Sequence, residues 1–313
     1  MKASFHESTN LSQTTLRSLV ERKNNLATLR FVLLCFAFVL VNMAVVWAWN
    51  EAWYFFVLAQ LAYSIVVCSI FAALHETGHG TAFKSRGANK IAAFLAGFAH
   101  VYPPSLFRAL HFTHHKYTHI PGKDPEISLG NRPAPSILVN PGMYLSWLTG
   151  FPLFFFKVMM VVAGAIGMPE FLRKNLYPFV QPQKRWAVFR ESALFLLIYV
   201  AIIYFAVTTI PSLWGIFVGQ IVGHCLLAFY VSMEHNGLDH EGSIFDKTRS
   251  MKTNKLVKLV MWNMPYHAEH HAYPAVPFHA LPELHEHLKP ELKHHEKSHL
   301  DFHLESWTKL IKK

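Results

Sequence analysis

The sequence predicts an all-α membrane protein with four transmembrane helices, arranged as two hairpins, and a cytoplasmic helical cap. Two observations lead to this prediction. Of the 313 residues, 52% are hydrophobic and only 15% are charged, whereas soluble proteins carry about 25% charged residues. Four apolar runs also reach the length of about 20 residues that a helix needs to cross a bilayer. The net charge of +10 then favours an anionic membrane surface over nucleic acid as the partner of the basic residues.

The four predicted spans form two pairs, and each pair is joined by a very short connection that favours two neighbouring antiparallel helices. Tryptophans stand at the ends of the runs, where interfacial aromatic residues gather: they are Trp47, Trp49, Trp53 and Trp214. The spans occupy residues 31–49, 52–74, 192–210 and 213–231.

The basic residues give the orientation. The connections 50–51 and 211–212 contain no Lys or Arg, and Lys157 is the one basic residue outside the N-terminal arm, the two large loops and the C-terminal region. The positive-inside rule therefore places both termini and both large loops, 75–135 and 172–190, in the cytoplasm.

Two weaker apolar runs, 91–103 and 143–167, are predicted to pack as re-entrant or interfacial segments, because one extra crossing would export the basic tail. Lys157 also argues against a lipid-exposed span there. We divide the chain into a cytoplasmic arm (1–30), a membrane domain (31–290) and a polar tail (291–313).

Two further expectations concern side chains outside the main motifs. The cysteines lie in apolar runs without a CxxC pair, so we expect small buried hydrophobes rather than disulfides: Cys35, Cys68 and Cys225. The histidines near the C-terminus are expected at the solvated surface: His285, His287, His294, His295, His299 and His303.

Three histidine clusters lie on the cytoplasmic side of the predicted spans: at the end of the second span, in the loop that follows it, and beyond the fourth span. The stretch 75–79 reads HETGH, 111–115 reads HFTHH and 267–271 reads HAEHH. Residues three and four apart share a helix face, so each cluster can direct its imidazoles toward one place. One zinc ion needs only three or four ligands, so eight imidazoles predict a His-rich site for two metal ions in the cytoplasmic cap. Imidazole binds Fe, Zn, Cu and Ni, so the ligand type does not choose the metal.

Two alternatives come from other classes of protein. A metal transporter would carry ionisable residues along its spans, but among the histidines only His224 is well inside one. A zinc-dependent membrane hydrolase would use HETGH as an HExxH motif with Glu76 as the base. That alternative leaves both HxxHH clusters unexplained.

The three clusters, in this order between apolar hairpins, resemble the histidine boxes of the integral-membrane fatty acid desaturase and hydroxylase superfamily. The resemblance covers about residues 31–290, and the phrases HETGHGTAF and NMPYHAEHHAYPAVPFHALPELH are similar to bacterial members of its desaturase branch. It implies two Fe ions, molecular oxygen as co-substrate and an external electron donor. The implied iron ligands are His75, His79, His111, His114, His115, His267, His270 and His271, with His235 as the ninth and His224 as its competitor.

The implied activity is oxygen-dependent desaturation of an acyl chain or related lipid-like substrate, with a hydroxylase or monooxygenase on the same site as the alternative. Glu234 is expected to be either a partner of a ligand imidazole or an interfacial charge, and His119 lies outside the boxes. Apolar residues near 72–74 and 228–230 are expected to line an acyl channel. The chain departs from stearoyl-type enzymes, which place four residues between the first two histidines and an Asn where Val231 stands.

Electrons are expected from a separate ferredoxin, rubredoxin or cytochrome/reductase, because the chain has no flavin, haem or iron–sulfur motif. Four basic residues near the boxes would attract an acidic donor: Lys84, Arg86, Arg108 and Lys116. The expected location is a bacterial inner membrane. The sequence leaves the substrate and the position of a double bond open.

Overall fold

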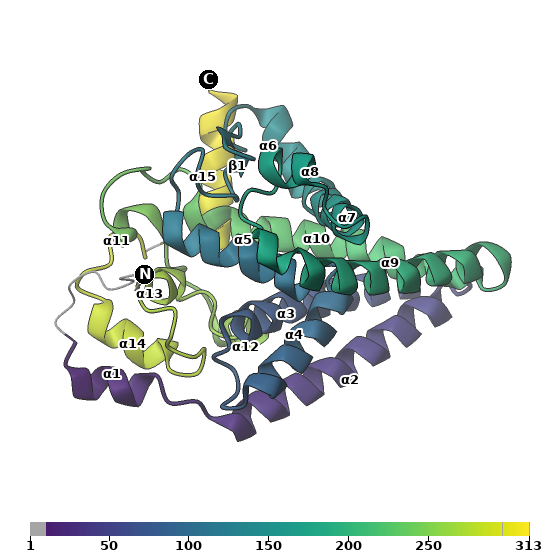
Figure 1. Ribbon diagram of the computed structural model, residues 1–313, viewed down its shortest axis with the longest axis horizontal. Helices are drawn as coiled ribbons and strands as arrows, with labels where there is room; N and C mark the ends of the chain where they lie inside the picture. The colour runs from purple at the N-terminus through teal and green to yellow at the C-terminus, as the bar shows by residue number, and fades with distance from the viewer. Residues whose placement is uncertain (1–10, 296, 313) are drawn as a thin grey trace.

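The computed structural model describes residues 11–295 and 297–312, and nearly all of their regular structure is helical (Figure 1). The one sheet in these ranges is a two-stranded antiparallel pair, β1 (Ser128–Leu129) and β2 (Arg132–Pro133). The prediction of an all-α chain with four helices long and apolar enough to cross a membrane is confirmed. These are α2 (Asn24–Ala48), α3 (Trp53–His79), α9 (Arg185–Thr208) and α10 (Trp214–His235).

The remaining helices are shorter and lie around these four. In the first half of the chain they are α1 (Gln13–Leu19), α4 (Arg86–Ala99), α5 (Pro104–Tyr117), α6 (Pro141–Leu148), α7 (Phe151–Ala165) and α8 (Glu170–Asn175). In the second half they are α11 (Ile244–Lys247), α12 (Lys255–Val260), α13 (His267–Ala272), α14 (Leu281–Leu288) and α15 (His299–Ile311). Short 3-10 turns precede α9 and α10, at Pro182–Lys184 and Pro211–Leu213.

Helices α3 and α10 pack closely because α10 presents glycines to α3. A Cβ on Gly219 would lie 2.7 Å from the Tyr63 ring, and one on Gly223 would lie 2.8 Å from Val67 Cβ. Val41 and Val45 bring α2 onto the same core, beside Tyr63 and Val67. The outer faces of α2 and α9 carry exposed apolar side chains such as Phe36 and Leu197, as expected of helices in contact with lipid.

The two weaker apolar runs are helical but do not form straight spans. The run 91–103 lies mostly in α4, and the run 143–167 is divided between α6 and α7, whose axes are bent by 63°. The bend is at Gly150, which has a φ of 67°. A Cβ there would overlap the backbone of His224 and Cys225. Only glycine allows both this left-handed backbone and this close approach.

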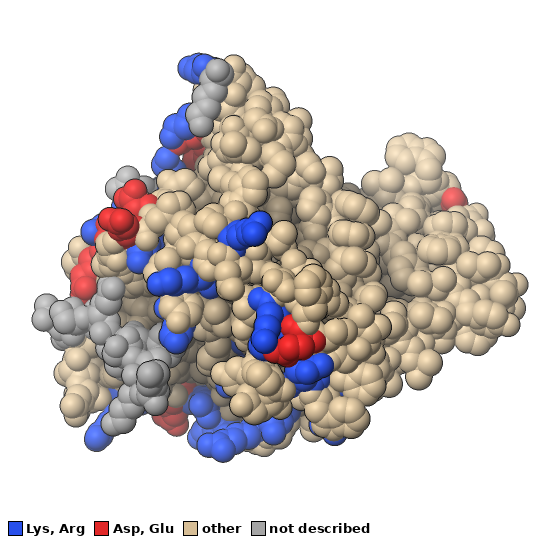
Figure 2. Space-filling view, turned by 45° about the horizontal axis from the view of Figure 1, so that its top comes forward, with Lys and Arg blue, Asp and Glu red and all other residues tan. Residues whose placement is uncertain are grey.

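Charged side chains are distributed unevenly over the molecule. Figure 2 shows Lys, Arg, Asp and Glu gathered over the left and lower part of this face, while the right-hand end is almost entirely uncharged. Between residues 31 and 83 the only charged residues are Glu51 and Glu76. The molecule is therefore amphipathic as a whole, with an apolar helical end and a charged end.

The two ends of the described chain pack against the body of the protein. Leu19 of α1 lies in one apolar cluster with Leu281, Leu284 and Leu288 of α14. In α15, His303 is buried, donates from Nε2 to the Phe229 carbonyl at 2.8 Å, and contacts the Tyr144 hydroxyl. The expectation that all six C-terminal histidines lie at the solvated surface is therefore wrong, because α15 covers α10.

The three cysteines are free, as predicted. Cys68 is buried, whereas Cys35 and Cys225 are only half-buried.

Candidate metal centre

The first cluster lies in the last turns of α3. This helix continues past the apolar run to His79 and ends at Gly80, whose φ of 76° allows the left-handed cap. His75 and His79 are one helical turn apart and face the same side. Glu76 points elsewhere: it accepts a hydrogen bond from the Phe278 amide at 3.2 Å. A carboxylate bound in this way is not aimed at the histidines, which removes the base that an HExxH hydrolase requires.

The second cluster lies in α5, which crosses close to the end of α3. A Cβ on Gly78 would lie 2.8 Å from the Phe107 ring, so this glycine permits the crossing. Arg108 donates to the Gly78 carbonyl and places its guanidinium 4.4 Å from the Phe112 ring centre. The crossing brings His111 beside the histidines of α3.

The third cluster forms the short helix α13, all of whose residues are buried. Glu269 has 0% exposure and contacts both the Ser250 hydroxyl and His285 Nδ1. Glu269 therefore lies on the side of α13 away from the histidine ligands, where its carboxylate ties α13 to α14 and to the preceding loop.

Eight of the nine predicted histidines gather in two places. The first histidine group takes residues from α3, α5 and α13, and the second from α5, α10 and α13. In each group one ring nitrogen per residue lies within 4.8 Å of the others. The first histidine group is His75, His79, His111, His115 and His270, and the second is His114, His235 and His271.

Short distances between Nε2 atoms show how the rings converge. In the first histidine group, His79 is 2.8 Å from His111 and 3.1 Å from His270. In the second, His114 is 3.3 Å from His271. His267 lies beside the second group, with its Nε2 2.9 Å from that of His235.

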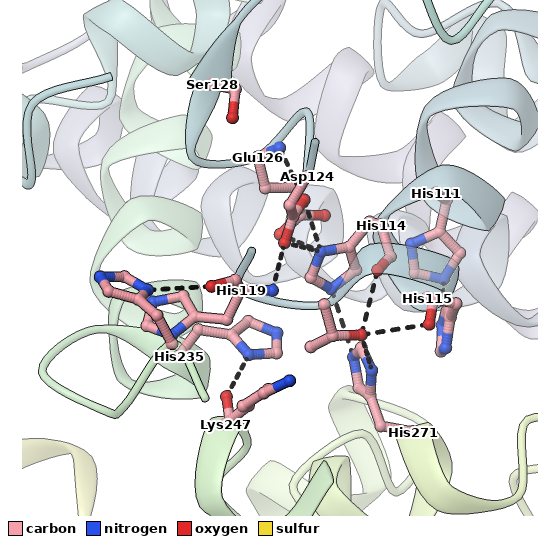
Figure 3. A network of polar contacts seen from close by, with 12 residues as sticks. His111, His114, His115, His119, Asp124, Glu126, Ser128, His235, Lys247 and His271 are labelled. Carbon is pink, nitrogen blue, oxygen red and sulfur yellow. Dashed lines mark hydrogen bonds and ion pairs between the residues drawn. The ribbon is translucent and has the colours of Figure 1, made fainter. Parts of the chain in front are cut away.

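In the second histidine group, each Nδ1 atom is held by a partner on the outer side (Figure 3). His114 Nδ1 lies 2.9 Å from the Asp124 carboxylate, His235 Nδ1 donates to the Lys247 carbonyl at 2.8 Å, and His271 Nδ1 lies 3.2 Å from the Thr118 hydroxyl. The Thr118 hydroxyl donates to backbone carbonyls of α5, so it accepts from His271. With Nδ1 protonated, Nε2 of a neutral ring carries its lone pair. Metal-bound histidines are oriented in this way.

The first histidine group contains buried nitrogen atoms that have no hydrogen-bond partner. Both ring nitrogens of His75 and Nδ1 of His115 are unpaired, as is His267 Nδ1 beside the second group. Buried polar atoms without partners are costly. A metal ion takes one nitrogen from each ring, so an ion in the first histidine group would satisfy one orphaned nitrogen of His75. This atom and the converging Nε2 atoms fit a pair of metal ions.

Burial sets the protonation of most of these rings. It lowers the pKa of His111, His115 and His271 well below the usual value and that of His270 to about 3. These rings are neutral near pH 7, which is the form that binds metal.

His114 is the exception. Burial lowers its pKa, but the Asp124 and Glu126 carboxylates outweigh burial and raise it to about 9. The same carboxylates that favour a proton on His114 would favour a cation at its Nε2.

The other predicted residues have different surroundings. His224 belongs to neither histidine group. Its Nε2 atom instead lies 3.0 Å from Lys157 Nζ. Glu234 is buried, with Oε1 3.6 Å from His267 Nδ1. The backbone amide of His119 donates to Asp124 at 2.7 Å. Asp124 was not identified from the sequence. Its position in the loop just after the second cluster could have suggested a carboxylate partner for a histidine of that cluster.

A cavity of about 740 Å³ lies beside the two groups and is lined by His75, His111, His114, His235 and His267. Residues 72–74 and 228–230, near which an acyl channel was expected, do not line this cavity. Phe71 of α3 and Leu227 and Val231 of α10 line it instead. Ala72, Ala73 and Leu74 are fully buried in the packed core.

A search of curated proteins finds no match to this chain. The model of the fatty acid desaturase family matches residues 51–302 and confirms the resemblance inferred from the histidine boxes. The matched segment runs from the connection before α3 into α15 and includes all nine histidines of the centre. Since this match covers most of the chain together with the whole candidate centre, the protein belongs to the fatty acid desaturase family.

Proposed function

We propose that this membrane oxidoreductase is an oxygen-dependent di-iron desaturase that introduces a double bond into an acyl chain or related lipid-like substrate. The observation that carries the proposal is the division of the histidines into two converging groups beside one cavity. Family membership supports the oxidoreductase class.

We assign the ligands by position. One iron would be held by the five residues of the first histidine group, and the other by His114, His235, His267 and His271. His235 is preferred to His224 as the ninth ligand because its Nε2 meets that of His267, whereas His224 is bonded to Lys157. When bound, the two irons with molecular oxygen and two electrons from a donor would supply the oxidising power to remove hydrogen from an unactivated carbon.

The chain itself positions the substrate and limits access of water. Phe71, Phe107 and Leu110 line the cavity next to the histidines and offer an apolar surface to a hydrocarbon chain. Apolar cavities of several hundred Å³ are typical of small-molecule sites. Hydroxylation would use the same ligands, and the difference lies in how the substrate carbon is held.

We further propose that an acidic electron-transfer protein, such as a ferredoxin, rubredoxin or cytochrome, docks near Arg108. Arg108 is exposed, and the Phe112 ring beneath it lies 5.3 Å from the His79 ring. Electrons would therefore have a short route from the surface to the first histidine group.

We also propose a membrane topology. Residues 31–290 form the membrane domain, both termini face the cytoplasm, and the protein resides in a bacterial inner membrane.

The test is mass spectrometry of total lipids from a host that expresses the chain, beside a His114→Ala control. Products that lack two hydrogen atoms and are absent from the control support desaturation. Products with one added oxygen atom would instead make the protein a hydroxylase. Iron analysis of the purified protein is the second readout: two irons per chain support the centre, and a single zinc contradicts it.

A further inference from the structure

Lys157 of α7 is buried among apolar helices, with 1% of its surface exposed. Its Nζ lies 2.6 Å from His100 Nε2 and 3.0 Å from His224 Nε2. The rings of Phe71 and Tyr102 flank the amine at 5.7 and 5.4 Å. An ionisable side chain at such a depth is costly to bury, and inside a membrane protein it commonly marks a functional site.

The hydrogen bonds around Lys157 have a defined direction. His224 Nδ1 donates to the Gln220 carbonyl at 2.7 Å, so its Nε2 carries the lone pair and accepts from the amine. His100 offers its Nε2 to the same amine. A lysine ammonium has three N–H donors. In the protonated form, two contacts with imidazoles leave one donor for a further acceptor, and an incoming carboxylate would favour that form.

The cavity beside the metal centre extends to Lys157. Lys157 lines this cavity together with Phe71, Tyr102, Leu153 and Phe156. The Phe71 ring lies 5.4 Å from the His100 ring and 6.5 Å from the His75 ring. One aromatic side chain thus separates Lys157 from the first histidine group. Because Phe71 precedes His75 by one turn of α3, the amine lies on the side of the apolar span.

No anionic partner accompanies this cluster. Within residues 11–295 and 297–312, no Asp or Glu side chain forms a hydrogen bond or ion pair with Lys157, His100 or His224. His114, by contrast, is paired with the carboxylate of Asp124. A buried lysine without such a partner either loses its proton or takes its counter-charge from a bound group, since buried charges are paired.

We propose that Lys157, supported by His100 and His224, binds the carboxylate of an amphiphilic substrate whose apolar body fills the cavity beside the histidine groups. This subsite rests on the desaturase function proposed above and gives its substrate a chemical class. The substrate is a free acid that enters with its carboxylate toward the helical bundle. A carbon near the carboxylate end would then face the metal centre.

A hydrocarbon tail is a poor occupant for this end of the cavity. A terminal methyl group offers neither an acceptor nor a counter-charge, so it gives the amine nothing to bind. An esterified acid has no charged oxygen and carries extra volume at the point of contact. A carboxylate supplies both the acceptor and the missing negative charge.

The test compares dodecanoate with methyl dodecanoate as ligands of the full-length, metal-loaded protein in lipid nanodiscs. The native protein is expected to bind dodecanoate at least about tenfold more tightly than the ester, the range of one charge-assisted hydrogen bond. Lys157→Met should weaken dodecanoate binding about ten- to hundredfold and leave the ester nearly unchanged. Lys90→Met, at an exposed lysine of α4, is the matched control and should change neither affinity.

Equal affinity of the native protein for acid and ester would overturn the subsite, and this result requires no variant to fold. Equal losses for both ligands in Lys157→Met would also overturn it, because Lys157 would then contribute equally to binding of the acid and of the ester. Binding is measured without turnover. A preference for the acid without lipid oxidation would therefore count against the desaturase function alone, and oxidation without the preference would count against the subsite alone.

Discussion

Asp124 is the residue on which the second histidine group most directly depends. It has 1% exposure, and its carboxylate meets His114 Nδ1 at 2.9 Å and accepts from the His119 amide at 2.7 Å. The carboxylate thereby fixes the ring so that Nε2 points toward His271. Partners of this kind raise the basicity of a metal-bound imidazole.

Asp124→Asn should weaken metal binding, because the amide keeps the shape of the side chain and loses its charge. The expected loss of metal affinity is about 10- to 100-fold, measured by competition with a chelator of known affinity. Asp239→Asn is the control, since this nearby aspartate is exposed and contributes only its backbone carbonyl to His119. Unchanged affinity in Asp124→Asn would show that the carboxylate does not support a metal site.

Glu269 links helix α13, which carries the third cluster, to its neighbours in the fold. Its buried carboxylate contacts His285 of α14, sixteen residues further along the chain. His285→Ala should destabilise the fold by about 1–3 kcal/mol, the usual cost of leaving a buried polar group short of a partner. Chemical denaturation in detergent measures this. His287→Ala, two residues away and exposed, should be nearly neutral, and equal effects of the two substitutions would contradict the assigned role.

Helical spacing predicts that the histidines within one cluster point to one side, and the structure brings eight of the nine predicted residues into two groups. The sequence could not predict the partners of those histidines. Asp124, Glu269 and Lys157 lie in different elements from the groups that they contact, and such contacts follow from tertiary packing alone. The same limit explains the error over His303, whose surroundings come from the docking of α15 on α10.

At the scale of helices, the hydropathy pattern located all four long helices but not their full lengths. The run 52–74 is apolar, but α3 continues to His79 and ends at the left-handed cap formed by Gly80. The run 213–231 likewise continues in α10 to His235. An apolar run predicts the part of a helix that contacts lipid, but the helix itself can continue into polar residues, as it does in α3 and α10. The polar extensions are the parts that carry His75, His79 and His235.

The close crossing of α3 and α10 holds those extensions in place. Gly223→Ala would put a methyl group 2.8 Å from Val67 Cβ, and overpacking of this kind costs about 1–3 kcal/mol. We expect a lower melting temperature and a lower metal content. Gly87→Ala in α4 is the control, because its nearest neighbour would be Ser85 Oγ at 3.6 Å. A Gly223→Ala protein that melts and binds metal like the native one would argue against a rigid crossing.

For the whole molecule, the distribution of charge predicts which end faces the cytoplasm. Glu51 lies in the connection between α2 and α3, and Lys289 follows α14 at the opposite, charged end. Both are exposed. In a background with the three native cysteines replaced by alanine, Glu51→Cys should react with a membrane-impermeant thiol reagent on intact cells. Lys289→Cys should react only after permeabilisation, and the reverse pattern would invert the topology.

Metal should also stabilise the entire fold, because the histidines come from four elements that are otherwise distant in sequence. One ion at the first histidine group would link α3, α5 and α13, and one at the second would link α5, α10 and α13. A ligand present at 100 times its Kd stabilises the folded state by about 2.7 kcal/mol. Chelation of the purified protein should therefore lower its melting temperature, and added iron should restore it. The double variant His270→Ala, His271→Ala removes one ligand from each group, so its melting temperature should respond little to the chelator. If the native protein loses its iron without any change in melting temperature, the histidine groups are not joined by metal.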